Sequence, residues 1–156
     1  ISRASIFIGM VLGEMLVIFA TTLIIIIAFL IYTKSLSIIS ILWAFFFMVL
    51  IAFGFYGFSI VLSFLFKKAK SYQIITGIIT GIIVFLSGAF FPIRNLPYWI
   101  KFIAIINPLT YGVDGLRRAL TGYGEFSLWF NVVFLIIFGF CMVVLGSFAF
   151  KKSIDI

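Results

Sequence analysis

The sequence predicts an all-α protein: a polytopic transmembrane bundle of four helical spans plus a broken, re-entrant helical hairpin on the extracellular side. Three observations support this prediction. Of the 156 residues, 65% are hydrophobic and 10% are charged, whereas about a quarter of a soluble domain is charged. Four apolar runs are each long enough to cross a hydrocarbon core of about 30 Å. Lysines cluster in short segments beside those runs. We therefore treat residues 1–156 as one transmembrane domain.

The first two predicted spans are residues 6–31 and 38–66, joined by a short polar turn. The β-branched and Leu-rich stretch at 23–27 would suit a buried strand in water, but the length of the run favours a helix. Glu14 is the one acidic residue of the first run. We interpret it as lying near the cytosolic headgroups, and an intramembrane proton or cation site is the alternative. The second run is long enough to indicate tilt or a kink near Gly54 and Gly57.

The third predicted span is residues 74–91, and the fourth is residues 126–150. In the third, Gly77, Gly81 and Gly88 are spaced so that we expect them on one helical face. Small residues on one face let another helix approach closely. That helix could belong to the same subunit, or the face could meet a partner subunit or line a substrate pathway.

The predicted hairpin occupies residues 92–125, and proline interrupts it at Pro92, Pro97 and Pro108. Between these breaks the segment stays too apolar for a solvated loop. We expect Asn95 to cap a short helix with Pro97 in its first turn, ending near Ile106. Asn107 should cap a second helix that begins at the next proline and ends near Gly122. A hairpin that only anchors the chain at the membrane interface is the alternative to a functional one.

The second hairpin helix also places Asp114 within reach of Arg117 at i+3 and Arg118 at i+4. We expect an ion pair in a buried setting, with Arg117 as the preferred partner and Arg118 reaching lipid headgroups.

Four sequence blocks in this region carry a family resemblance. They are Ser87–Pro92 (SGAFFP), Leu96-Pro97, Ile106–Tyr111 (INPLTY) and Asp114–Arg117 (DGLR). In order and spacing they resemble the C-terminal signature of the type-2 ABC exporter permeases, a family that includes drug-efflux and cell-surface polysaccharide export permeases. The resemblance is densest over about a quarter of the chain.

The resemblance implies a permease subunit that exports an amphipathic or surface-polymer substrate, as in multidrug efflux, by alternating access. It implies two partners besides membrane lipid: a cytosolic ATP-binding subunit and a second permease copy, in a homodimer or heterodimer. The resemblance also favours the interpretation in which the face of Gly77, Gly81 and Gly88, here called the glycine face, meets a partner subunit or lines the substrate pathway. It also implies that the hairpin caps the exit, with these residues at the gate: Phe91, Pro92, Pro97, Asn107, Pro108, Tyr111, Asp114 and Arg117.

Such permeases have six spans, so we expect the chain to be the C-terminal part of one, with two spans and a cytosolic coupling helix before it. Ser2 and Arg3 would then abut that coupling helix, which touches the ATPase. The substrate class cannot be transferred from the family, because permeases of drugs, lipids and polysaccharides share the signature.

The composition argues against other classes of function. The net charge of +7 comes largely from juxtamembrane lysines, which anchor helices rather than bind nucleic acid. One cysteine and no histidine cannot form an intrachain disulfide or a zinc site. The spacing of the four acidic residues suggests no catalytic pair, so we expect no enzyme activity. The sequence also has no phosphate-binding loop, so we expect no cofactor on this chain and ATP on the partner subunit.

Charge clustering predicts the orientation. With four spans, the two termini and the loop of Lys67, Lys68 and Lys70 share one side, which we assign to the cytosol of a plasma-membrane protein. The remaining basic residues, mostly in the hairpin, lie outside. A membrane scaffold or assembly subunit without transport activity is the competing interpretation.

Overall fold

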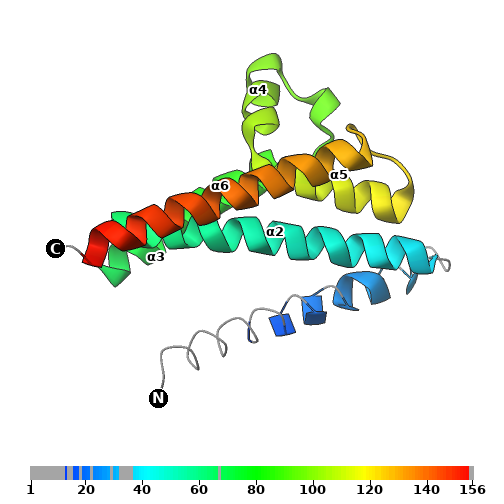
Figure 1. Ribbon diagram of the computed structural model, residues 1–156. Coiled ribbons are helices and arrows are strands. Elements are labelled where there is room, and N and C mark those ends of the chain that lie inside the picture. The colour runs from blue at the N-terminus through cyan, green and yellow to red at the C-terminus, as the bar shows by residue number, and fades with distance from the viewer. Residues whose placement is uncertain are drawn as a thin grey trace.

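The computed structural model describes residues 13, 16–17, 19–21, 23–28, 30–31, 37–66 and 68–154, with side chains up to residue 148. Within these ranges the chain forms helices and turns and no strand, which confirms the predicted all-α class. The elements are α2 (Ile38–Leu65), α3 (Ala69–Leu86), the 3₁₀ helix η1 (Ile93–Asn95), α4 (Tyr98–Ile106), α5 (Pro108–Thr121) and α6 (Leu128–Ile154), shown in Figure 1.

Three helices of the described part are long and apolar enough to cross a membrane: Ile38–Leu65, Ala69–Leu86 and Leu128–Phe148. The predicted span 38–66 agrees with α2 to within one residue, and the last span is displaced slightly toward the C-terminus. Most of the predicted first span, together with Glu14, Ser2 and Arg3, lies outside the described residues.

The third predicted span needs a correction, because α3 begins and ends five residues earlier than residues 74–91. The helix stops at Leu86, where the Ser87 hydroxyl donates to the Val84 carbonyl at 2.7 Å. Gly88 then adopts φ +77°, a left-handed conformation that ends helices and suits glycine. Gly88 therefore lies in a turn and does not extend the helical face of Gly77 and Gly81.

The start of α4 also differs from the prediction. Asn95 belongs to η1, and the residue that precedes α4 is Pro97. Leu96 is extended (φ −78°, ψ 146°), as expected for a residue before proline, so no helix can run from Asn95 into α4. The predicted end at Ile106 is confirmed.

The core lies where α2, α5 and α6 pack together, and Phe47, Tyr111, Val132 and Leu135 are buried there. Glycines bring α2 and α6 into close contact. A Cβ on Gly54 would lie 2.7 Å from the Phe138 ring, and one on Gly139 would lie 2.6 Å from the Phe53 ring. In Figure 1, α5 runs beside both long helices, whereas α4 projects away from them.

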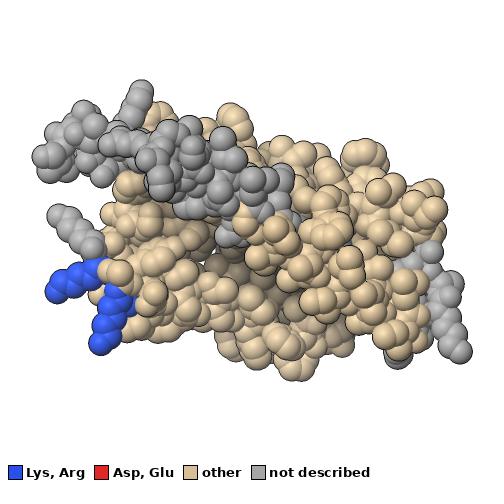
Figure 2. Space-filling model, turned by 90° about the horizontal axis from the view of Figure 1, so that it is seen from below, with Lys and Arg blue, Asp and Glu red and all other residues tan. Residues whose placement is uncertain are grey.

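Charged side chains are distributed unevenly along the bundle. In Figure 1 the C-terminal end of α6 lies at the same end of the molecule as the junction between α2 and α3. Lys68 and Lys70 are exposed at that junction. Figure 2 shows a face on which Lys and Arg gather at one end and the other described side chains are uncharged. This distribution suits a membrane protein with a basic edge at one surface.

Candidate functional site

The candidate site is built on α5, and Asn107 fixes where that helix starts. Its Oδ1 accepts from the backbone N–H of Leu109 at 3.0 Å, which confirms the predicted cap. Its Nδ2 donates to the Ile83 carbonyl of α3 at 2.7 Å. One amide therefore caps α5 and ties its first turn to the end of the preceding span. Pro108 follows as the first helical residue, where the missing N–H costs nothing.

Two side chains of α5 hydrogen-bond to backbone carbonyl groups at the end of α4. The Thr110 hydroxyl donates to the Ala104 carbonyl at 2.6 Å, and the Tyr111 hydroxyl donates to the Ile105 carbonyl at 2.7 Å. Helix ends leave such carbonyls without partners within the helix. This accounts physically for the Asn-Pro-Leu-Thr-Tyr block, which closes α4 and starts α5 at a break in an apolar environment.

Close packing holds α5 in the bundle. The Tyr111 ring stacks on Phe134 of α6 with centroids 3.8 Å apart. On the side facing α2, a Cβ on Gly112 would lie 2.5 Å from the Ile51 side chain, and one on Gly115 would overlap the Phe47 ring. Only glycine allows this approach at both positions. These are the tightest glycine contacts of α5, and sequence reasoning missed both.

The predicted ion pair of Asp114 with Arg117 or Arg118 is wrong. Asp114 is 1% exposed. Its Oδ1 accepts from the Glu125 backbone N–H at 2.6 Å. Its Oδ2 accepts from the Phe126 N–H at 3.1 Å and the Asn131 Nδ2 at 2.9 Å. The connection between α5 and α6 folds back over α5 and brings these donors to the carboxylate. Asp114 therefore joins α5 to the start of α6.

Arg117 takes a different role from the one expected. Its Nη2 donates to the Gly88 carbonyl at 2.6 Å, across 29 residues of sequence. The side chain thus connects the turn after α3 to the C-terminal half of α5 by a hydrogen bond. Arg118 makes only a 3.4 Å hydrogen bond from Nη2 to the Gly124 carbonyl. Within the described residues, the one ion pair joins Arg94 Nε and Glu125 Oε1 at 3.6 Å.

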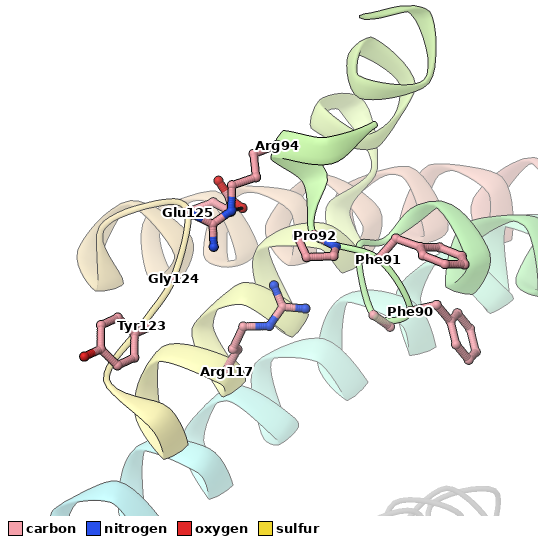
Figure 3. A pocket seen from close by; sticks show the side chains of 9 residues that line it. Phe90, Phe91, Pro92, Arg94, Arg117, Tyr123, Gly124 and Glu125 are labelled. Carbon is pink, nitrogen blue, oxygen red and sulfur yellow. Dashed lines mark ion pairs between the residues drawn. The ribbon is translucent and has the colours of Figure 1, made fainter. Parts of the chain in front are cut away.

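A cavity of about 400 Å³ opens beside Arg117 (Figure 3). Four segments line it: the turn after α3, η1, α5 and the connection to α6. Its lining residues are Ala89, Phe90, Phe91, Pro92, Arg94, Arg117, Tyr123, Gly124 and Glu125. Figure 3 shows the Arg117 guanidinium between the turn at Pro92 and the connection at Gly124.

The predicted gate residues separate into three groups. Phe91, Pro92 and Arg117 line the cavity. Pro108 starts α5, and Asn107, Tyr111 and Asp114 hold that helix to its neighbours. Pro97 precedes the projecting α4. The cavity also takes in Arg94, Tyr123 and Glu125, which sequence reasoning had not included. Their placement depends on tertiary contacts of the two connections.

The glycine face of α3 lies apart from this cavity. A Cβ on Gly77 or Gly81 would find nothing within 4 Å, so no other described part of the chain packs against either glycine. The proposed coupling residues Ser2 and Arg3 lie outside the described residues.

The membrane-domain model of the ABC-2 type transporter family matches residues 1–121. The chain belongs to this family. It is a membrane permease component of an ABC transporter, as the signature blocks indicate. Permeases of this kind typically work with an ATP-binding subunit, and the family is a transport component rather than an enzyme in its own right. Comparisons with curated proteins and with solved structures gave no match.

Proposed function

We propose that this ABC-2 permease is the transmembrane subunit of an ATP-driven exporter. It moves an amphipathic or surface-polymer substrate out of the cytosol by alternating access. A separate cytosolic subunit binds and hydrolyses ATP. The permease acts in the plasma membrane with the end bearing Lys67, Lys68 and Lys70 in the cytosol and the segment from Pro92 to Glu125 outside.

The observation that carries the proposal is the discontinuous segment formed by α3, the turn at Gly88 and α5. A break in a helix at membrane depth is tolerated only where protein or a water-filled cavity satisfies the freed backbone groups. Here Asn107 and Arg117 donate to carbonyls of α3 and of the turn at Gly88. Thr110 and Tyr111 donate to carbonyls at the end of α4, where the chain enters α5. A segment built in this way, beside a cavity, suits a gate at the exit of a transport pathway.

The open face of α3 supports a second permease copy. Gly77 and Gly81 have no neighbour within 4 Å of an added Cβ, and α3 has no buried residue within the described part. A helix that exposes small residues in this way suits close packing with another helix. We assign the face to a homodimer or heterodimer contact beside the pathway.

The test is reconstitution of the full-length permease with its ATP-binding subunit in liposomes. We expect the two subunits to co-purify, and ATP hydrolysis by the pair to exceed that of the ATP-binding subunit alone. A variant of that subunit that binds but does not hydrolyse ATP serves as the control. Transport by the permease without any ATPase would contradict the proposal. Failure to associate or to alter hydrolysis would favour the scaffold interpretation.

A further inference from the structure

We propose that the cavity beside Arg117 binds the phosphate group of an anionic amphiphile, with the hydrocarbon part lying along the exposed apolar edge of α3. The proposal rests on the charge, the hydrogen-bonding capacity and the position of the cavity. It does not depend on ATP coupling or on the direction of transport.

The first observation is an uncompensated cation. A guanidinium carries five N–H donors, and the structure assigns one hydrogen bond to Arg117, from Nη2 to the Gly88 carbonyl. Its predicted partner Asp114 instead accepts hydrogen bonds from Glu125 N–H, Phe126 N–H and Asn131. No carboxylate of the described residues lies within 4.0 Å of Arg117. A partly buried charge without a partner is costly, so the remaining donors are available to an anion.

The second observation is the charge balance of the lining. Arg94 and Arg117 face the single carboxylate of Glu125. The Arg94–Glu125 pair is long, at 3.6 Å, and the Arg94 side chain is 75% exposed, so it contributes little and is easily rearranged. The lining therefore carries an excess positive charge. Two guanidinium groups favour phosphate, whose oxygens accept paired N–H donors from arginine.

The third observation is the apolar edge that leads away from the cavity. Phe90 and Phe91 line it and are 64% and 53% exposed. Both rings contact Phe85 on α3, with centroids 6.2 and 6.1 Å apart. Exposed isoleucines continue along the helix at Ile82, Ile78 and Ile74. The cavity is thus polar at one end and continuous with an apolar strip, the shape that an amphiphile requires.

The fourth observation is depth. The 18 residues of α3 rise by about 27 Å, close to the thickness of a hydrocarbon core of about 30 Å. Lys68 precedes α3 and Lys70 lies in its first turn. The cavity follows the other end of the helix directly, and we place it near the headgroups on the side opposite these lysines, where lipid phosphates lie.

Binding can be measured on the purified full-length permease in neutral detergent, without any ATPase. Native mass spectrometry compares phosphatidic acid with diacylglycerol of the same chains. We expect phosphatidic acid to bind and diacylglycerol not to bind. Equal binding of both lipids would overturn the phosphate assignment. Displacement of the lipid by inorganic phosphate at micromolar concentration would show a small-anion site and overturn the assignment to an amphiphile.

Variants locate the site. Arg94→Gln, at an exposed position, should weaken binding about tenfold, and Arg117→Gln should weaken it at least as much. Glu125→Gln removes the competing carboxylate and should strengthen binding by roughly threefold or more. A merely structural role for the cavity would not produce this gain. Lys101→Gln, on α4, makes the same change in net charge outside the lining and should leave binding within about twofold of the wild type. Weakening by Glu125→Gln, or equal effects of Arg94→Gln and Lys101→Gln, would contradict the proposal.

Discussion

At the residue scale, Asp114 shows how one buried carboxylate organises the connection between two helices. It accepts hydrogen bonds from two backbone N–H groups and from Asn131, all within the segment that leads into α6. An anion near the start of a helix is also favoured by the helix dipole. Asp114 therefore stabilises the junction of α5 and α6, and the neighbouring arginines remain available for other roles.

The first prediction tests this role. Asp114→Ala leaves buried donors without an acceptor and should cost at least about 2 kcal/mol, seen as a melting temperature lowered by roughly 5–10 °C in detergent. Asp114→Asn keeps one acceptor oxygen and should cost less. Exchanging the charges, Asp114→Arg with Arg117→Asp, should recover none of the lost stability, because the two residues are not paired.

Fluorescence-detected size-exclusion after heating measures these effects, and Glu125→Gln is the control because its backbone N–H is unchanged. Recovery of stability in the exchanged pair would show that Asp114 and Arg117 interact after all.

At the scale of elements, the glycines divide the helices into two classes. Gly112 and Gly115 let α5 approach α2, and Gly54 and Gly139 let α2 approach α6. Gly77 and Gly81 of α3 have open space beside them. The first class acts within the folded chain, whereas nothing in the described part of the chain packs against the second.

The second prediction separates these classes. Gly115→Ala forces a methyl group into the Phe47 ring and should destabilise the permease by about 1–3 kcal/mol. Gly81→Leu should leave the melting temperature of the monomer unchanged and weaken association of two permease copies. Thermal stability and crosslinked dimer yield are the two readouts. A stable, fully dimeric Gly81→Leu protein would exclude this face from the dimer contact.

At the scale of the whole molecule, basic residues lie at both ends of the bundle but in different settings. The junction of α2 and α3 carries exposed Lys68 and Lys70, and α6 terminates at the same end. The opposite part holds the cavity with Arg94 and Arg117. Short loops with clustered basic residues favour the cytosolic side of the membrane. We leave the arginines of the proposed binding site out of this comparison of loop charges.

The third prediction concerns orientation. Single cysteines are placed at Ser71 and at Asn95 in a Cys141→Ser background. An impermeant thiol reagent applied to intact cells should label the cysteine at position 95 and spare the one at position 71. Labelling after permeabilisation controls for accessibility. The reverse pattern would invert the proposed topology.

The sequence by itself determined the features that depend on local chemistry. Apolar length and charge clustering predicted a helical membrane protein, and the signature blocks predicted its family. The residues 107, 108 and 122 marked the start and end of α5, because caps and glycine terminators act within one helical turn.

Only the tertiary structure decided which groups meet across the fold. The helical spacing of Asp114 and Arg117 allowed an ion pair. In the structure Asp114 instead accepts from the backbone of the α5–α6 connection, and Arg117 donates to the Gly88 carbonyl, 29 residues earlier in the sequence. Spacing likewise placed Gly77 and Gly81 on one face without revealing what lies opposite. The cavity joins residues of four segments, and local periodicity carries no information on such long-range partners.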